Sequence, residues 1–139
     1  FFTDTFVQIL QESHAQKKPS LELEKHHLGI THAQIGAMLL EHWKFPQSIV
    51  RAVGYHHNPI AVDSNKDLVA TIRLADVMCE LWGIGFDEDI QAVDLYSDAG
   101  WKTLKSFTPK LIGLDVERFL FEVDKEIEKA KMFIEFVNE

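Results

Sequence analysis

Cysteine is almost absent from this chain of 139 residues, and several other features that would mark a protein class are missing with it. The single Cys79 excludes an internal disulfide, which fits a reducing compartment. The uncharged stretches fall short of the roughly 18 residues that a membrane span requires. The first residues also lack the basic and apolar segments of a signal peptide. These absences predict a cytoplasmic protein.

Basic residues are scarce as well. The chain has 14 Lys and Arg against 22 Asp and Glu, which gives a formal charge of −8. No run of Lys or Arg is longer than two residues. Because nucleic acids and anionic membrane surfaces are bound through basic patches, we expect neither a nucleic acid nor a membrane as a partner.

The common catalytic and nucleotide-binding motifs are missing too. The sequence has no G-x-x-x-x-G-K-[ST] loop and no G-x-G-x-x-G segment after a strand. It has no G-x-S-x-G nucleophile turn either. Alternating polar and apolar residues bounded by hairpin turns do not occur, so strands are not expected.

The chain instead has apolar residues at helical spacing along most of its length. Helices are expected at about 2–18, 20–28, 31–43, 46–57, 67–82 and 115–137. One or two short helices are expected between 86 and 107, with Gly100 and Pro109 as breakers. The predicted fold class is all-α, a compact multi-helix bundle forming one domain over residues 1–139.

The clearest helix start is at Thr31, which forms a capping-box pattern with Gln34. For the helix at 67–82, the expected inward stripe is Leu68, Ile72, Ala75, Cys79 and Trp82. This places Cys79 in the core as an inert thiol.

Four residues are candidates for a metal site. His32 starts its helix beside the inward face, His56 and His57 continue the inward lines of the next helix, and Asp76 lies at the edge of an apolar stripe. Imidazole and carboxylate groups bind Zn, Fe, Mn or Ni, and a buried carboxylate needs a partner. The alternative is structural: such residues are more often hydrogen-bonded boundary residues, and their spacing matches no short metal motif.

The same region resembles a known family. The segment 28–46 is similar to the HDOD signature, through Gly29, His32, Ala33, Gly36, Ala37, Leu39, Leu40, Trp43 and Pro46. The segment 55–59 supplies the following "HH-x-P" element, and 74–76 supplies an "L-A-D" element. Upstream, Glu22-Leu23-Glu24 matches a charged "E-x-E" stretch. The resemblance implies a helical bundle of the HD-domain type and an output or interaction role in bacterial signalling.

HDOD domains are related to metal-dependent HD phosphohydrolases. The resemblance assigns His32 to a lone histidine of those enzymes, His56 and His57 to a histidine pair, and Asp76 to a closing aspartate. The chain departs from them in two ways: it has no His-Asp dipeptide, and Asn58 stands where the enzymes have an acid. We therefore expect the carboxy-terminal part of an HDOD domain, without its earliest helices.

Three functions follow as alternatives. The favoured one is a non-catalytic signalling module that docks a protein partner or a neighbouring domain. The second is a metal-dependent phosphohydrolase acting on a nucleotide or cyclic dinucleotide, and the third is a residual metal or ligand sensor. No catalytic residue is assigned, and the cofactor of the last two would be Fe, Mn, Zn or Ni. Apolar faces left by the missing helices predict a homodimer, or exchange of helices between copies.

Overall fold

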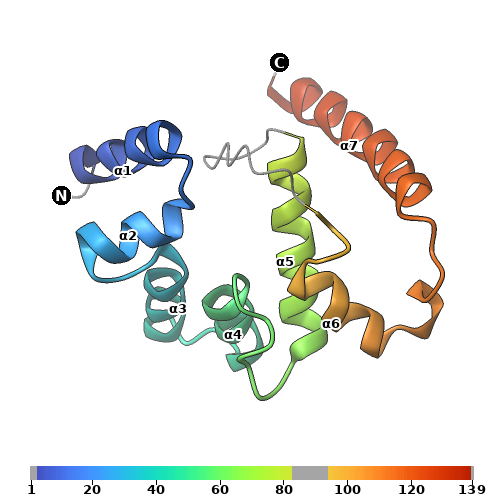
Figure 1. Cartoon of the computed structure of the whole chain (residues 1–139), viewed down its shortest axis with the longest axis horizontal. Helices are drawn as coiled ribbons and strands as arrows, with labels where there is room; N and C mark the ends of the chain where they lie inside the picture. The colour runs from blue at the N-terminus through green and yellow to red at the C-terminus, as the bar shows by residue number, and fades with distance from the viewer. Residues whose placement is uncertain (1–2, 83–93, 139) are drawn as a thin grey trace. The chain divides into compact units, whose positions relative to one another are not determined.

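The computed structural model describes residues 3–82 and 94–138, and within these ranges every regular element is a helix (Figure 1). In chain order the elements are α1 (Thr3–Gln16), α2 (Ser20–Leu28), α3 (His32–His42), α4 (Gln47–Tyr55), α5 (Lys66–Leu81), α6 (Ala99–Phe107), the 3₁₀ turn η1 (Pro109–Leu111) and α7 (Val116–Asn138). The expected all-α class is therefore confirmed. None of these helices combines the length and apolarity needed to cross a membrane.

The contacts between residues divide the chain into two units, 1–107 and 108–139. The first unit contains α1 to α6, and the second contains η1 and α7. The single domain over residues 1–139 stays a prediction.

Most helices of the first unit pack against a neighbour in the chain. The described pairs are α1 with α2, α3 with α4, α4 with α5, and α5 with α6. The buried apolar residues of this unit are Ile9, Leu23, Ala33, Val50, Ala52, Val62, Val69, Ala70, Leu74, Val77, Met78, Leu95 and Trp101. The helices α3, α4 and α5, which position the candidate site residues, each contribute to this set.

The start of α3 follows the sequence pattern closely. The Thr31 hydroxyl accepts a hydrogen bond from the Gln34 N–H at 3.3 Å, and the Gln34 side chain accepts one from the Thr31 N–H at 3.1 Å. This reciprocal pair is a capping box, and it satisfies N–H groups that have no partner within the helix. The box fixes His32 as the first helical residue.

The start of α4 differs slightly from the expected one. Pro46 was expected in the first helical turn, but it is the N-cap residue, and α4 begins at Gln47. The helix ends at Tyr55, so His56 is its C-cap residue and His57 lies in the turn that follows. Both histidines are therefore held at the carboxyl end of α4.

Small residues let α3 and α4 approach closely. A Cβ atom on Gly36 would lie only 2.8 Å from Cγ1 of Val53, and one on Gly54 only 3.1 Å from Cβ of Ala37. The two helices run antiparallel, because the start of α3 meets the end of α4. Their close packing therefore brings His32 to the histidine pair.

Replacing Gly36 with alanine should destabilise the first unit by about 1–2 kcal/mol. Overpacking of this kind costs about 1–3 kcal/mol, and the better helix propensity of alanine returns up to about 1 kcal/mol. Chemical denaturation measures the change in the free energy of unfolding. In a Val53→Ala background the same substitution should be neutral or stabilising, because the colliding methyl group is gone. An equal loss in both backgrounds would rule out this contact as the cause.

The buried face of α5 is not the predicted one. The expected inward stripe contains Ile72, Ala75 and Cys79, and all three are exposed. The residues that are buried are Val69, Ala70, Leu74, Val77 and Met78. Because apolar residues occur almost all round this helix, their spacing did not determine which side faces the core. The prediction that Cys79 is a buried thiol is wrong.

The structure also corrects the role of Gly100. It was expected to break a helix, but it lies buried in the first turn of α6. A Cβ atom at this position would lie 2.7 Å from Cγ of Arg73, so glycine allows α6 to pack closely on α5. Pro109 does follow the end of α6 and begins η1. The rest of the predicted segment, up to residue 93, lies outside the described residues.

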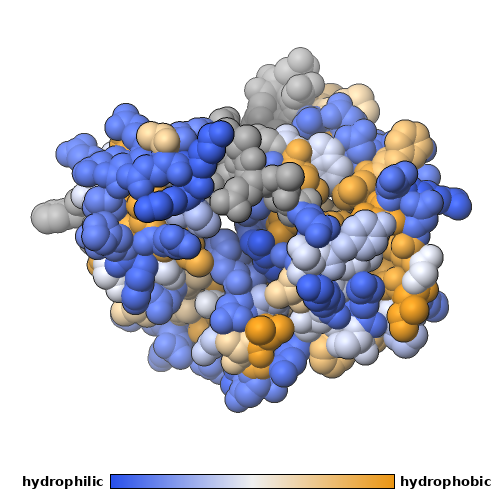
Figure 2. All heavy atoms as spheres, in the orientation of Figure 1, coloured by the Kyte–Doolittle hydropathy of each residue, from blue (hydrophilic) through white to orange (hydrophobic). Residues whose placement is uncertain are grey.

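In the second unit, Asp115 caps the long helix α7. Its Oδ1 accepts a hydrogen bond from the Arg118 N–H at 3.1 Å. Several large apolar side chains of α7 are exposed. They are Phe121, Met132, Phe133, Phe136 and Val137. Figure 2 shows orange, hydrophobic surface on the right of the view, where Figure 1 draws this helix. These exposed apolar side chains form a surface of α7 that a partner could cover.

Candidate functional site

Three of the four predicted site residues come together. His32 at the start of α3 meets His56 and His57 at the end of α4, and one ring nitrogen of each lies within 4.8 Å of the others. Among the described residues this is the one group of His, Cys, Asp or Glu side chains with the spacing of a metal site. We call these residues the histidine cluster. That the cluster holds a metal stays a prediction.

Glu24 of α2 orients the first histidine of the cluster. Its Oε2 accepts a hydrogen bond from the His32 backbone N–H at 2.8 Å, and its Oε1 lies 2.8 Å from Nδ1 of the same residue. The Glu24 carboxylate is buried, whereas the His32 side chain is 42% exposed. A carboxylate at a helix N-terminus is favoured by the helix dipole. Glu24 therefore satisfies the helix start and turns Nε2 of His32 toward the cluster.

His56 is fixed by the backbone of its own helix. Its Nδ1 donates a hydrogen bond to the carbonyl oxygen of Val53 at 2.7 Å, and the side chain is buried. Its Nε2 lies 3.4 Å from Nε2 of His32. A metal-binding histidine commonly has its other nitrogen bonded in this way, because that bond sets the tautomer and the ring orientation.

His57 is held between His32 and α5. Its Nε2 lies 2.9 Å from Nε2 of His32, and its Nδ1 lies 3.4 Å from Nη1 of Arg73. Burial lowers the pKa of His57 to about 3, together with repulsion from His56 and His32 when these are protonated and from Arg73. Its ring is therefore neutral at physiological pH, which is the form that can bind a metal.

Asp76, the fourth predicted residue, does not join the cluster. Its Oδ2 accepts a hydrogen bond from Nη1 of Arg73 at 3.1 Å, and this same guanidinium nitrogen contacts His57. Arg73 also pairs with Asp98 of α6 at 3.1 Å and lies 3.8 Å from Glu80. The guanidinium thus stands between the aspartate and the histidines.

The geometry can be compared with known proteins. Residues 1–59 match the sequence model of the HDOD domain family, described as "HDOD domain". The resemblance drawn from the motif is confirmed over this part of the chain. The HDOD match contains Glu24 and all three histidines of the cluster, and it ends before α5, so Arg73 and Asp76 lie beyond it.

Other comparisons add little to the HDOD match. An uncharacterized protein of Treponema pallidum (strain Nichols) is 35% identical over 49 residues, which are 34% of this chain and 10% of that protein. The chain therefore aligns with about a tenth of this relative's length. No solved structure matches the chain.

Sequence reasoning missed the functional relevance of Glu24 and Arg73. Glu24 belongs to the "E-x-E" match of the HDOD resemblance, but no role was assigned to it. A signal for it exists: Ser20, Leu23 and Glu24 are all buried residues of α2, so an acid lies on an inward face. For Arg73 the sequence offers no such signal, because its contacts depend on the position of α6.

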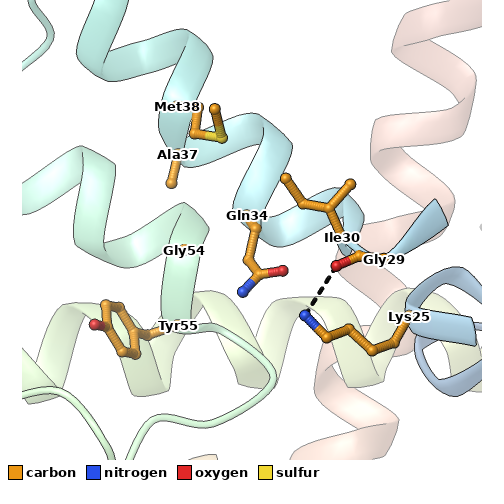
Figure 3. A pocket seen from close by; sticks show the side chains of 8 residues that line it. All are labelled: Lys25, Gly29, Ile30, Gln34, Ala37, Met38, Gly54 and Tyr55. Carbon is orange, nitrogen blue, oxygen red and sulfur yellow. Dashed lines mark hydrogen bonds between the residues drawn. The ribbon is translucent and has the colours of Figure 1, made fainter.

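A pocket of about 520 Å³ lies between the end of α2 and the helices α3 and α4 (Figure 3). Two polar side chains of its lining already form hydrogen bonds at helix ends. Lys25 Nζ donates to the Gly29 carbonyl oxygen at 3.0 Å, and Gln34 belongs to the capping box of α3. Met38 and Tyr55 add apolar and aromatic walls. This lining holds no acid or histidine, so the histidine cluster is the better candidate for chemistry.

Proposed function

We propose that this chain is a non-catalytic interaction module of a bacterial signalling protein, of the HDOD type. The observation that carries the proposal is the position of Arg73 between Asp76 and His57. In a metal-dependent hydrolase, anionic and imidazole ligands surround the ion and leave positions open for water and substrate. A guanidinium where the carboxylate ligand is expected repels a divalent cation.

Two further observations support this role. The HDOD match covers the part of the chain that carries the histidine cluster. Large apolar side chains are exposed at the corner between α3 and α4, among them Trp43, which is 61% exposed, and Phe45. Surfaces of this kind are typical of protein contacts. The proposed partner is therefore a protein, either a second copy or a neighbouring domain, in the cytoplasm.

A hydrolysis assay tests the non-catalytic role. The chain is incubated with cyclic diguanylate, or with bis(p-nitrophenyl) phosphate, in the presence of Mn²⁺, Fe²⁺ or Zn²⁺. We expect no turnover above that of the His56→Ala variant, because Arg73 lies between the histidines and Asp76, the acidic ligand that would complete a hydrolytic site. Metal-dependent turnover that disappears in this variant would refute the proposal and favour the phosphohydrolase.

A second candidate, a metal sensor, is favoured by the convergence of the three histidines. Without Asp76 the available donors are imidazole nitrogens, which suit Zn, Ni and Fe better than Mn. Glu24 and the Val53 carbonyl supply the outer hydrogen bonds that metal-binding histidines need. If the metal binds, the histidines and these partners would hold and orient it, and no chemical turnover is required of the site.

A further inference from the structure

The protons of the histidine cluster can be assigned from its hydrogen bonds. A neutral imidazole has one N–H and one acceptor nitrogen. The carboxylate of Glu24 accepts a hydrogen bond from Nδ1–H of His32, and the carbonyl oxygen of Val53 accepts one from Nδ1–H of His56. Both rings therefore present the lone pair of Nε2 to the cluster.

The spacing of these two lone pairs suits a metal. Two nitrogens bound to one tetrahedral zinc at about 2.0–2.1 Å lie about 3.3–3.4 Å apart. Nε2 of His32 and Nε2 of His56 are 3.4 Å apart. Because neither nitrogen carries a proton, this contact is not a hydrogen bond, and a cation between the two rings would stabilise it. His56 supplies a rigid ligand, since only 9% of this residue is exposed.

The His57 ring has the opposite tautomer. Arginine has donors only, so Nδ1 of His57 accepts from Nη1 of Arg73. The ring proton is then on Nε2, which donates to Nε2 of His32 at 2.9 Å. To bind a metal through Nε2, His57 must move this proton to Nδ1, where it would face the Arg73 N–H. Arg73 would have to withdraw first.

We infer that Arg73 is a positioning residue that keeps the proton of His57 on Nε2, so that this N–H occupies the lone pair of His32 and the histidine cluster binds a divalent transition ion weakly until Arg73 moves. This inference rests on the metal sensor proposed above. Arg73 is tied to Asp98 at the start of α6, and Gly100 keeps α6 close to it. The position of α6 on α5 therefore sets whether His57 blocks His32 or joins it as a ligand, and through that choice it sets the affinity for metal.

Nuclear magnetic resonance reads the tautomers directly in the unaltered chain. Long-range correlation spectra of the ring nitrogens, recorded on metal-free protein at neutral pH, distinguish a proton on Nδ1 from one on Nε2. We expect the Nε2–H form for His57 and the Nδ1–H form for His32 and His56. A His57 ring protonated on Nδ1 overturns the inference, and this result does not depend on any variant folding.

Zinc titrations then test the consequence. Arg73→Gln should bind Zn²⁺ about tenfold more tightly than the unaltered chain, because the amide oxygen of glutamine can accept a hydrogen bond from Nδ1–H of His57, which leaves Nε2 of His57 free to bind the metal. Arg51→Gln is the control of equal charge, since Arg51 lies on α4 and pairs weakly with Asp63 at 3.9 Å. In a His57→Ala background, Arg73→Gln should change the affinity less than about twofold.

The outcomes separate the two proposals. Equal zinc affinity of the unaltered chain and Arg73→Gln overturns the role of Arg73, while the metal sensor stands. A gain that persists in the His57→Ala background, or that Arg51→Gln reproduces, is an effect of net charge and also overturns it. Absence of zinc binding in every variant overturns the metal sensor itself.

Discussion

Replacing Glu24 with alanine should weaken Zn²⁺ binding at the histidine cluster by about 10- to 100-fold, the usual effect of losing an outer hydrogen bond to a metal ligand. The carboxylate accepts a hydrogen bond from Nδ1–H of His32, with 2.8 Å between Oε1 and Nδ1. This bond sets both the tautomer and the direction of the ring. Without it the 42% exposed ring is free to rotate and to exchange tautomers. Isothermal titration calorimetry of the metal-free chain measures the loss.

Two other substitutions sharpen the result. Glu24→Gln keeps one acceptor for His32 but loses the charge, so its affinity should fall between those of the alanine variant and the unaltered chain. Glu22→Ala removes the same charge from an exposed position of the same helix and should leave the affinity unchanged within about twofold. If Glu22→Ala weakens binding as much as Glu24→Ala, general electrostatics govern the site and the orienting role is wrong.

The site could be predicted wherever the sequence determines both the helix and its buried side. The capping box at Thr31 fixes His32 as the first residue of α3, and Gly36 lets α4 lie close against that helix. Antiparallel neighbours joined by a short turn bring the start of one helix to the end of the next. These local rules are sufficient to place His32 beside His56 and His57.

Asp76 could not be placed by the same reasoning. Apolar residues surround α5 so evenly that its inward side depends on the partner helices, and α6 packs on α5 close to Arg73. This rotation exposes Cys79 and brings Arg73 toward α4. The contact between Arg73 and Asp98 joins residues 25 positions apart, and no local pattern predicts such a pair.

Asp98 therefore connects the start of α6 to Arg73 beside the histidine cluster, and replacing it should lower the stability of the first unit. Its Oδ1 accepts hydrogen bonds from the Gly100 N–H at 2.7 Å and from the Trp101 N–H at 3.1 Å, which caps α6. Its Oδ2 pairs with Nε of Arg73, and only 9% of the aspartate side chain is exposed. Asp98→Ala should destabilise the first unit by about 2–4 kcal/mol, from a lost cap of about 1 kcal/mol and a broken, largely buried ion pair.

Asp98→Ser separates these two contributions. Serine is a good N-cap residue but is too short to reach Arg73, so it should recover about 1 kcal/mol relative to alanine and leave the rest of the loss. Urea denaturation measures the free energy of unfolding of both variants. If serine restores full stability, the ion pair contributes nothing, and Arg73 is not anchored through α6. If serine remains destabilised, the same residue that caps α6 also holds the guanidinium against His57, and the stability of α6 and the state of the histidine cluster change together.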